Sequence, residues 1–320
     1  MNYQDFKENI IKADDIIIFS HVNPDGDTLG SMIALYLIIK NNYKKEPVMV
    51  VAGEIPDIYC FLPQIDKAVT FDKIEKDRVF DLAIAIDVAA KDRMGAGVPI
   101  FDRAKVKMNI DHHKTNNGYG DYALICPDAC SAGEILFDMF ESLKFPIDKD
   151  TADALYTSIL TDTGGFRYDN TTAKSFRIAA KLVECGINAG EIARYCFETK
   201  AKQMVLLQAN ALINAEFFEN QKIVCTCITN SDMEHFNAKE DYTEGIVGTL
   251  RQIKTTEVAA VLKEVTSQST KVSLRSKNVD VSKIAGAFNG GGHIFAAGCT
   301  IQKPIKIAKE KLVEEIKKYL

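Results

Sequence analysis

One short stretch carries an imidazole and two carboxylates within a few residues: His21-Val22-Asn23-Pro24-Asp25-Gly26-Asp27-Thr28-Leu29-Gly30-Ser31. The apolar run Ile16–Phe19 before it predicts a buried strand, and the apolar stretch Met32–Ile39 after it predicts a helix. The loop between them is therefore expected at the carboxyl end of a strand, where open α/β sheets build their sites. Carboxylates combined with an imidazole suit manganese, magnesium or iron. The alternative is a helix N-cap made by Asp27 or Thr28.

Further acidic residues and histidines follow other predicted elements. Asp87 comes directly after the apolar run Leu82–Ile86, Asp111-His112-His113 follows Val106–Ile110, and Asp162 ends a helical stretch. Because adjacent residues of an extended segment point in opposite directions, one of the two histidines would face a metal and the other the substrate or solvent. Asp111 could hydrogen-bond an imidazole and fix its tautomer.

These positions together offer imidazoles and four carboxylates in addition to Asp111. That is enough for two divalent ions that share one bridging carboxylate. Two such ions close together activate water and stabilise the attacking and leaving oxygens at phosphorus. Read alone, Asp87 would be equally consistent with a cap of the next turn, and Asp162 would be a weak signal.

The pattern of apolar runs predicts an α/β fold. In residues 1–130, helical patterns alternate with the runs Ile16–Phe19, Val48–Val51, Ala68–Phe71, Leu82–Ile86 and Val106–Ile110. This alternation predicts a mainly parallel sheet with helices on both faces, in a domain of residues 1–187. A helical linker is expected at 188–219. A smaller mixed α/β domain at 220–320, across a cleft, is predicted to have strands at 223–228, 258–263 and 271–275.

Composition limits the classes of protein. The chain has 320 residues, 47% of them hydrophobic and 26% charged, as in a soluble globular protein. Its net charge of −5 offers no overall attraction for long nucleic acid. We expect no signal peptide and no membrane association, because no basic leader and no apolar run of membrane-spanning length is present. The eight cysteines lack C-x-x-C spacing, so a cytoplasmic protein with reduced thiols is expected.

Taken in order, the motifs resemble a known family. His21-x-x-Pro24-Asp25-x-Asp27, then Asp87, then Asp111-His112-His113, then Asp162 resemble the four motifs of the DHH phosphoesterase superfamily. The run Gly290-Gly291-Gly292-His293-Ile294-Phe295-Ala296-Ala297-Gly298 resembles the GGGH motif of the DHH-associated C-terminal domain. Asn289 departs from the pattern, because many relatives have another glycine there. Within the superfamily, the size and two-lobe layout resemble the nano-RNase group.

The resemblance implies a role for each residue of the first lobe. His21 and Asp25 would hold one divalent cation, and Asp27, His112 and Asp162 the other, with Asp87 as the bridging and catalytic carboxylate. His113 would contact a phosphoryl oxygen or protonate the leaving oxygen. Asp111 would not bind the metal itself but would hold the neighbouring side chains in place. Manganese is the expected ion, and magnesium is the alternative.

The second lobe is expected to bind substrate rather than to react with it. The backbone N–H groups of Gly290, Gly291 and Gly292 would donate hydrogen bonds to a phosphate, with His293 as a further donor. Arg275 could engage a phosphate with two hydrogen bonds. Phe166, Arg167 and Tyr168 could stack on a base, with core packing as the alternative for Phe166.

The expected function is hydrolysis of very short oligoribonucleotides, such as pApA, to 5′-mononucleotides. Removal of the 3′-phosphate from 3′-phosphoadenosine-5′-phosphate is expected at the same metals. A cyclic-di-AMP phosphodiesterase and a non-catalytic nucleotide sensor are the alternatives. A homodimer is expected by analogy with the family.

Overall fold

The computed structural model describes residues 2–75 and 77–320 of the chain. The chain divides between Thr199 and Lys200 into two compact units, which we call the N-terminal and C-terminal units. None of the helices in the described residues is long and apolar enough to cross a membrane.

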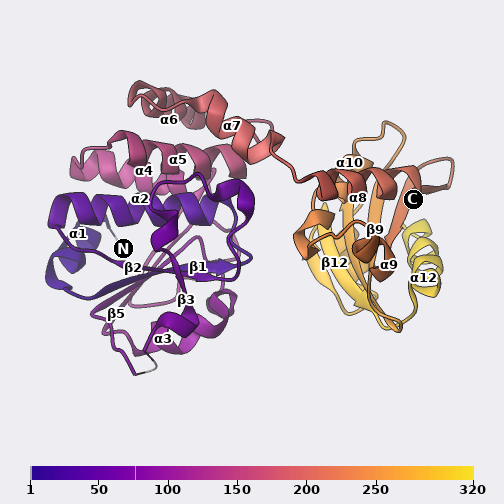
Figure 1. The fold of residues 1–320 in the computed structure, drawn as a ribbon, viewed down its shortest axis with the longest axis horizontal. Coiled ribbons are helices and arrows are strands. Elements are labelled where there is room, and N and C mark those ends of the chain that lie inside the picture. The colour runs from indigo at the N-terminus through magenta and orange to yellow at the C-terminus, as the bar shows by residue number, and fades with distance from the viewer. Residues whose placement is uncertain (1, 76) are drawn as a thin grey trace. The chain divides into compact units, whose positions relative to one another are not determined.

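The N-terminal unit alternates strands and helices along the chain (Figure 1). Its strands are β1 (Ile16–Val22), β2 (Val48–Ala52), β3 (Val69–Thr70), β4 (Leu82–Ile86), β5 (Val106–Asp111) and β6 (Tyr122–Ile125). Its α-helices are α1 (Tyr3–Lys12), α2 (Gly26–Tyr43), α3 (Val98–Arg103), α4 (Ala132–Leu143), α5 (Lys149–Asp162), α6 (Ala173–Glu184) and α7 (Ala189–Glu198). A 3-10 segment, η4 (Lys91–Gly97), precedes α3.

These strands form one parallel sheet in the order β3-β2-β1-β4-β5-β6. The chain leaves β1 toward β2 on one side and returns to β4 on the other side of β1. The order therefore reverses between β1 and β4, and open α/β sheets bind their ligands outside the carboxyl ends of the strands at such a point. This topology confirms the predicted parallel α/β architecture.

Apolar side chains alternate between the two faces of this sheet. Ile16 and Ile18 of β1 pack toward α1, α2, α4 and α5, whereas Ile17 and Phe19 pack toward α3 and η4. Helices cover both faces, with α2, α4 and α5 on one side and α3 on the other (Figure 1). A strand buried on both faces needs an unbroken apolar sequence, which is what Ile16–Phe19 provides.

Helix α2 lies between the sheet and α5, and is buried along Gly26–Ile39. At Gly30, a Cβ atom would lie 2.4 Å from the carbonyl oxygen of Ala154 in α5. Glycine is therefore required for the two helices to pack this closely. The close crossing brings the C-terminal end of α5, with Asp162, toward the N-terminal end of α2, with Asp27.

The structure corrects the predicted loop at residues 21–31. His21 lies inside β1, which continues to Val22, and α2 begins at Gly26. Asp25 is the N-cap of α2 and accepts hydrogen bonds from the N–H groups of Asp27 and Thr28, so the predicted caps Asp27 and Thr28 were wrong. The predicted strand Ala68–Phe71 shortens to Val69–Thr70, and β6 was not predicted.

The C-terminal unit is a mixed sheet with helices on both faces. Its strands are β7 (Glu216–Phe218), β8 (Ile223–Ile228), β9 (Val258–Thr266), β10 (Ser269–Ser276), β11 (Gly291–His293) and β12 (Ala296–Ile301). Its α-helices are α8 (Lys202–Ile213), α9 (Asn230–His235), α10 (Ile246–Arg251), α11 (Val281–Gly286) and α12 (Ile305–Lys317). The strand order is β11-β12-β10-β9-β8-β7, and β8 and β9 are the parallel pair among antiparallel neighbours.

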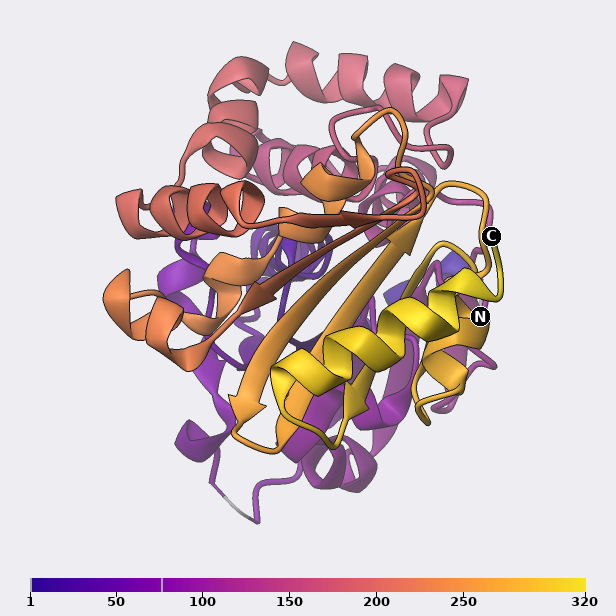
Figure 2. The same cartoon turned by 90° about the vertical axis from the view of Figure 1, so that its right-hand side faces the viewer.

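One face of this sheet packs against α11 and α12, and α12 crosses it in Figure 2. On the other face, Val224, Ala259 and Val261 of β8 and β9 pack against α8 and α10. The short strands β7, β11 and β12 were not predicted from the sequence. The segment 188–219, predicted as a linker, contains α7 in the N-terminal unit and α8 in the C-terminal unit.

Candidate metal centre

The first group of metal-ligating atoms lies at the ends of β1 and β4. The Nε2 atom of His21 is 3.6 Å from Asp25 Oδ1 and 3.6 Å from Asp87 Oδ2. These distances are too long for good hydrogen bonds. They suit atoms that bind one ion, because ligands about 2.1 Å from a metal lie about 3.0–3.5 Å apart.

The second group gathers residues from α2, the end of β5 and α5. The Nε2 atom of His112 lies 3.4 Å from Asp27 Oδ2, 3.7 Å from Asp162 Oδ2 and 3.5 Å from Asp87 Oδ1. The potential ligand atoms of Asp27, His112 and Asp162 all lie within 4.8 Å of one another. The tertiary structure therefore separates Asp25 and Asp27 into two different groups.

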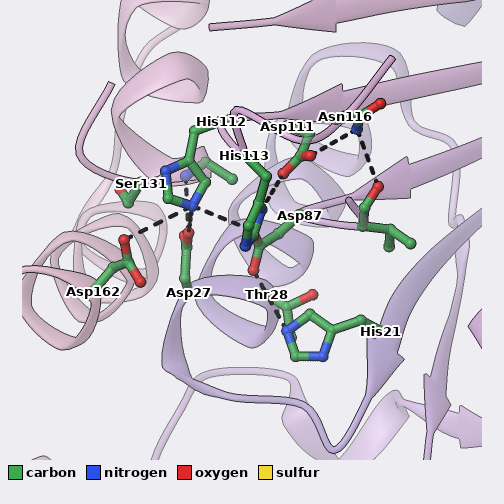
Figure 3. A network of polar contacts seen from close by, with 12 residues as sticks. His21, Asp27, Thr28, Asp87, Asp111, His112, His113, Asn116, Ser131 and Asp162 are labelled. Atoms are coloured by element: carbon green, nitrogen blue, oxygen red, sulfur yellow. Dashed lines mark hydrogen bonds and ion pairs between the residues drawn. The ribbon is translucent and has the colours of Figure 1, made fainter. Parts of the chain in front are cut away.

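Asp87 lies between the two groups, with Oδ2 toward His21 and Oδ1 toward His112 (Figure 3). Its side chain is 3% exposed, and Oδ1 has no hydrogen-bond partner within the described residues. A buried carboxylate oxygen without a partner is costly unless a cation binds it. This orphaned atom, with hard oxygen and imidazole donors around it, fits a pair of divalent ions bridged by Asp87.

His21 and His112 are both oriented by main-chain carbonyl groups. The Nδ1 atom of His21 lies 2.8 Å from the Val22 oxygen, and Nδ1 of His112 lies 3.3 Å from the Ala129 oxygen. A ring nitrogen that faces a carbonyl oxygen must carry the hydrogen and donate it. In the neutral imidazole, the lone pair is then on Nε2, on the side of the carboxylates, which is the tautomer that can bind a metal.

Asp27 is held at the N-terminal end of α4. Its carboxylate accepts hydrogen bonds from the N–H of Ala132 at 2.9 Å and from the hydroxyl groups of Ser158 at 2.5 Å and Ser31 at 3.1 Å. The helix N-terminus favours a negative charge there. Ser158 comes from α5, so the helix that carries Asp162 also positions Asp27. Sequence reasoning missed Ser158, because an isolated serine in a helical stretch carries no signal.

A second network positions the turn that carries Asp87. Asp87 has a left-handed backbone with φ of 58°, and the carbonyl oxygen of the next residue, Val88, accepts three hydrogen bonds. The donors are Asn109 Nδ2 at 3.3 Å, Asn116 Nδ2 at 3.2 Å and the Tyr119 hydroxyl at 2.9 Å. These bonds stabilise a strained turn that aims the carboxylate between the two groups. None of these three donors was predicted from the sequence.

Asn116 also connects this turn to His113 (Figure 3). Its Nδ2 lies 2.6 Å from Asp111 Oδ2, and the other oxygen of the fully buried Asp111 accepts a hydrogen bond from His113 Nδ1 at 2.8 Å. Asp111 thus orients His113 and leaves its Nε2 available for a substrate. The side chain of His113 is 40% exposed, whereas that of His112 is 13% exposed.

The expectation that the two histidines point in opposite directions was wrong. Strand β5 ends at Asp111, so neither histidine follows the strand alternation. Their ring centroids lie 4.7 Å apart, and both rings approach Asp87 Oδ1, at 3.5 Å for His112 and 3.6 Å for His113. The difference between them is exposure and hydrogen bonding rather than direction.

The crowding of carboxylates and imidazoles perturbs their protonation. Burial alone would lower the pKa of His21, but Asp25 and Asp87 raise it to about 10. The pKa of His112 is likewise raised to about 10, because Asp87, Asp27 and Asp162 outweigh its burial. Burial and the charge of Asp87 raise the pKa of Asp162 to about 6 despite the opposing charge of His112. In the absence of a metal ion, protons bound to these side chains therefore offset the negative charge of the carboxylates, which metal cations would otherwise do.

The pKa values of Asp111 and His113 move apart. Burial opposes ionisation of Asp111, but hydrogen bonds from His113 and Asn116 lower its pKa below the usual range. The hydrogen bond to Asp111 raises the pKa of His113. An imidazole with a raised pKa beside a permanent carboxylate can supply a proton to a leaving oxygen.

Residues predicted to bind substrate lie in the C-terminal unit. Arg275 is near the end of β10, and its guanidinium donates to the Leu274 carbonyl at 2.9 Å. Gly291, Gly292 and the exposed His293 form the edge strand β11, which pairs with β12. Part of the backbone N–H and carbonyl groups of this run is therefore used in the sheet.

The residues after Asp162 are used mainly in packing. Phe166 stacks on Phe176 with ring centroids 5.1 Å apart, and it packs against the main apolar core. The Arg167 guanidinium donates to the Gly164 carbonyl and lies 5.8 Å from the ring of Phe197. Tyr168 is 57% exposed. Core packing is thus the observed role of Phe166.

Comparison with known proteins agrees with this geometry. A family model for the N-terminal domain of the DHH family matches residues 15–159, and one for the DHHA1 domain matches residues 220–320. The probable bifunctional oligoribonuclease and PAP phosphatase NrnA of Streptococcus mutans is 31% identical over 97% of this chain and 96% of its own. This chain belongs to the DHH family. Membership makes it a metal-dependent phosphoesterase, as its motifs predicted.

Two other relatives extend the comparison. The bifunctional oligoribonuclease and PAP phosphatase NrnA of Thermus thermophilus is 30% identical over 95% of this chain and 90% of its own. Among solved structures, an exopolyphosphatase-related protein from Bacteroides fragilis superposes with a TM-score of 0.92 and is 26% identical. It covers 99% of this chain, and 96% of that protein is matched. The similarity thus includes both units of this DHH protein.

Proposed function

We propose that this DHH protein hydrolyses short oligoribonucleotides such as pApA to 5′-mononucleotides and removes the 3′-phosphate of 3′-phosphoadenosine-5′-phosphate. The observation that carries the proposal is Asp87, whose two oxygens face separate groups of ligands. The substrate class is supported by relatives named as oligoribonucleases and PAP phosphatases over nearly their whole length. Such substrates are intracellular nucleotides, so we place the enzyme in the cytoplasm.

In this proposal, His21, Asp25 and Asp87 would hold one divalent ion, and Asp27, His112, Asp162 and Asp87 would hold the other. Manganese is the preferred ion, with magnesium as the alternative, because the donors are oxygen and imidazole nitrogen. Such ions lower the pKa of water and stabilise negative charge at phosphorus. Asp111 holds His113 so that Nε2 can contact a phosphoryl oxygen or protonate the leaving oxygen. The C-terminal unit contributes Arg275, His293 and the glycine run Gly290 to Gly292 to substrate binding.

The first experiment offers the purified protein pApA, 3′-phosphoadenosine-5′-phosphate, cyclic-di-AMP and pyrophosphate separately, with manganese, and quantifies the products. We expect AMP from the first two and little turnover of pyrophosphate. A clear preference for cyclic-di-AMP would reassign the protein to signalling phosphodiesterases. No turnover of any of the four, with manganese shown to be bound, would reject the proposal in favour of a nucleotide sensor.

A pair of variants tests whether turnover comes from the candidate site. Asp87→Ala removes the carboxylate shared by both groups and should abolish turnover. Asp102→Ala removes an exposed carboxylate that pairs with Lys91, and it should leave turnover unchanged. Retained activity in Asp87→Ala would exclude the bridged two-ion site.

A further inference from the structure

The loop after α5 begins and ends at the candidate metal ligand Asp162. Three consecutive residues of this loop, Gly164, Gly165 and Phe166, have left-handed backbones with φ of 57°, 73° and 61°. They reverse the chain, which returns to Asp162 at Asn170. The side-chain N–H₂ group of Asn170 donates to the carbonyl oxygen of Asp162 at 3.1 Å and to its carboxylate at 3.3 Å. The loop is therefore fixed at the metal centre by both of its ends.

Hydrogen bonds to Thr163 hold the strained turn in one conformation. The buried hydroxyl of Thr163 accepts a hydrogen bond from the N–H of Phe166 at 3.1 Å. Its carbonyl oxygen accepts from the N–H groups of Arg167 at 2.9 Å and Tyr168 at 3.0 Å. Phe166 is held further by its stacking on Phe176. A left-handed residue other than glycine persists where its surroundings fix it in this way, so the backbone at Tyr168 has a defined position.

The ring of Tyr168 lies against the backbone of Gly164. A Cβ atom at Gly164 would lie 2.4, 2.5 and 2.6 Å from three carbon atoms of that ring. Because these distances are nearly equal, the Cβ position is over a face of the ring rather than at its edge. Tyr168 is nevertheless 57% exposed. One face of the ring thus packs on Gly164, and the other face is open to solvent.

The open face lies close enough to the metal centre for one nucleotide to reach both. Two Cα–Cα steps separate Gly164 from Asp162, a distance of at most about 8 Å. The carboxylate of Asp162 is 3.7 Å from Nε2 of His112, in the second group of ligand atoms. A nucleotide with its phosphate at this centre carries its base one sugar away from phosphorus. The base can therefore extend to the ring of Tyr168.

A rigid aromatic ring with one open face favours a nucleobase as its partner. Every base has a π face, and stacking on an aromatic side chain makes a substantial contribution to binding. Gly164 already holds the ring in place, so little conformational freedom is lost when a base binds. The neighbouring Arg167 is directed elsewhere: its Nε donates to the Gly164 carbonyl at 2.5 Å, and its guanidinium lies 5.8 Å from the ring of Phe197.

We propose that Tyr168 stacks on the base of the nucleotide whose phosphate lies at the candidate metal centre. This inference rests on the proposed function and deepens it. It gives the N-terminal unit its own means of selecting nucleotides over pyrophosphate and other phosphates that lack a base. Stacking tolerates every base, but the larger rings of purines overlap more of the phenol ring, so adenine should be held better than uracil.

The chain has no tryptophan, so Tyr168→Trp introduces a single fluorescent reporter at the proposed position. The probe is AMP, added with magnesium, and no turnover is needed. We expect AMP to quench the tryptophan emission, and ribose 5-phosphate, which has the sugar and the phosphate but no base, to leave it unchanged. Tyr319→Trp is the matched control, because Tyr319 is an exposed tyrosine after α12, and its emission should not respond to AMP. Absence of quenching in Tyr168→Trp, or equal quenching by ribose 5-phosphate, would overturn the proposal.

Steady-state hydrolysis of pApA with manganese separates base binding from a structural role. Tyr168→Ala should raise KM about tenfold with kcat nearly unchanged, because stacking holds the substrate and the transition state alike. Tyr168→Phe keeps the ring and should stay within about twofold of the wild type, and Tyr319→Ala should change neither constant. The wild type should prefer pApA to pUpU, and Tyr168→Ala should lose most of that preference. A fall in kcat at constant KM would overturn the proposal, because Tyr168 would then only support the loop at Asp162.

The fluorescence measurement does not depend on turnover, so this proposal and the proposed function can fail separately. Quenching of Tyr168→Trp by AMP, in a protein whose wild type hydrolyses neither pApA nor 3′-phosphoadenosine-5′-phosphate, would reject only the proposed function. Turnover of pApA with the same KM in the wild type and in Tyr168→Ala would reject only the stacking.

Discussion

Replacing Asn116 with alanine tests whether the network behind the metal centre controls catalysis. Asn116 Nδ2 lies 2.6 Å from Asp111 Oδ2, 2.8 Å from Asn109 Oδ1 and 3.2 Å from the Val88 carbonyl oxygen. The side chain thus connects the residue that orients His113 with the turn that carries Asp87. The replacement can therefore change catalysis although Asn116 does not itself contact a candidate metal ligand.

The expected magnitude follows from the groups left behind. Asp111 is fully buried and would lose a hydrogen bond to a charged oxygen, a loss of about 1.5–3 kcal/mol. Asn109 Oδ1 would lose its donor as well, whereas the Val88 oxygen would keep Tyr119 at 2.9 Å. We expect the free energy of unfolding to fall by about 2–4 kcal/mol in total. We expect kcat to fall about 10–100-fold, as is typical when residues that orient metal ligands are lost.

Two further variants make the assay specific. Tyr119→Phe removes one of three donors to Val88 and should lower stability by about 1 kcal/mol, with kcat within about threefold of the wild type. Asn116→Asp keeps the shape but places a carboxylate against Asp111, so kcat should fall further than in Asn116→Ala. The assay is steady-state hydrolysis of pApA with manganese, beside urea unfolding. If Asn116→Ala loses stability but keeps kcat and manganese affinity within twofold, the network supports only the fold.

Three other predictions concern protons, metal and helix packing. Because the pKa values of His21 and His112 in the metal-free site are about 10, manganese must displace protons, and its affinity measured by calorimetry should rise from pH 6.5 to 9; a flat profile would contradict the assigned ligands. The same raised pKa values add stability that is complete below pH 6.5 and lost as pH rises toward 10. Chelator-treated protein should therefore melt at a lower temperature at pH 9 than at pH 6.5, and saturating manganese should remove the difference. Gly30→Ala should push α5 away from α2, lower stability by about 1–3 kcal/mol and weaken manganese binding, whereas Gly190→Ala, where the nearest atom would be 3.8 Å away, should do neither.

Much of the architecture could be predicted from local sequence. The runs Leu82–Ile86 and Ile223–Ile228 are apolar and short, and they coincide with β4 and β8. Strands β11 and β12 escaped prediction, because their sequences are rich in glycine and alanine, and pairing with β10 rather than local preference makes them strands. The boundary of β1 was also missed, because His21 is polar and is tolerated in the strand through its carbonyl contact.

The chain order of Asp and His residues after predicted strands was sufficient to indicate the candidate metal centre. Parallel strands converge at one sheet edge, so residues such as Asp87 and Asp111 meet there whatever lies between them. The family resemblance had assigned Asp25 and Asp27 to different ions, and the tertiary structure supplies the physical reason, because α2 begins between them and turns their side chains apart. The tertiary structure also brought Asp162, Ser158 and Asn116 to the centre. These residues arrive through helix crossing and buried hydrogen bonds between distant segments, and such contacts depend on packing that no local pattern encodes.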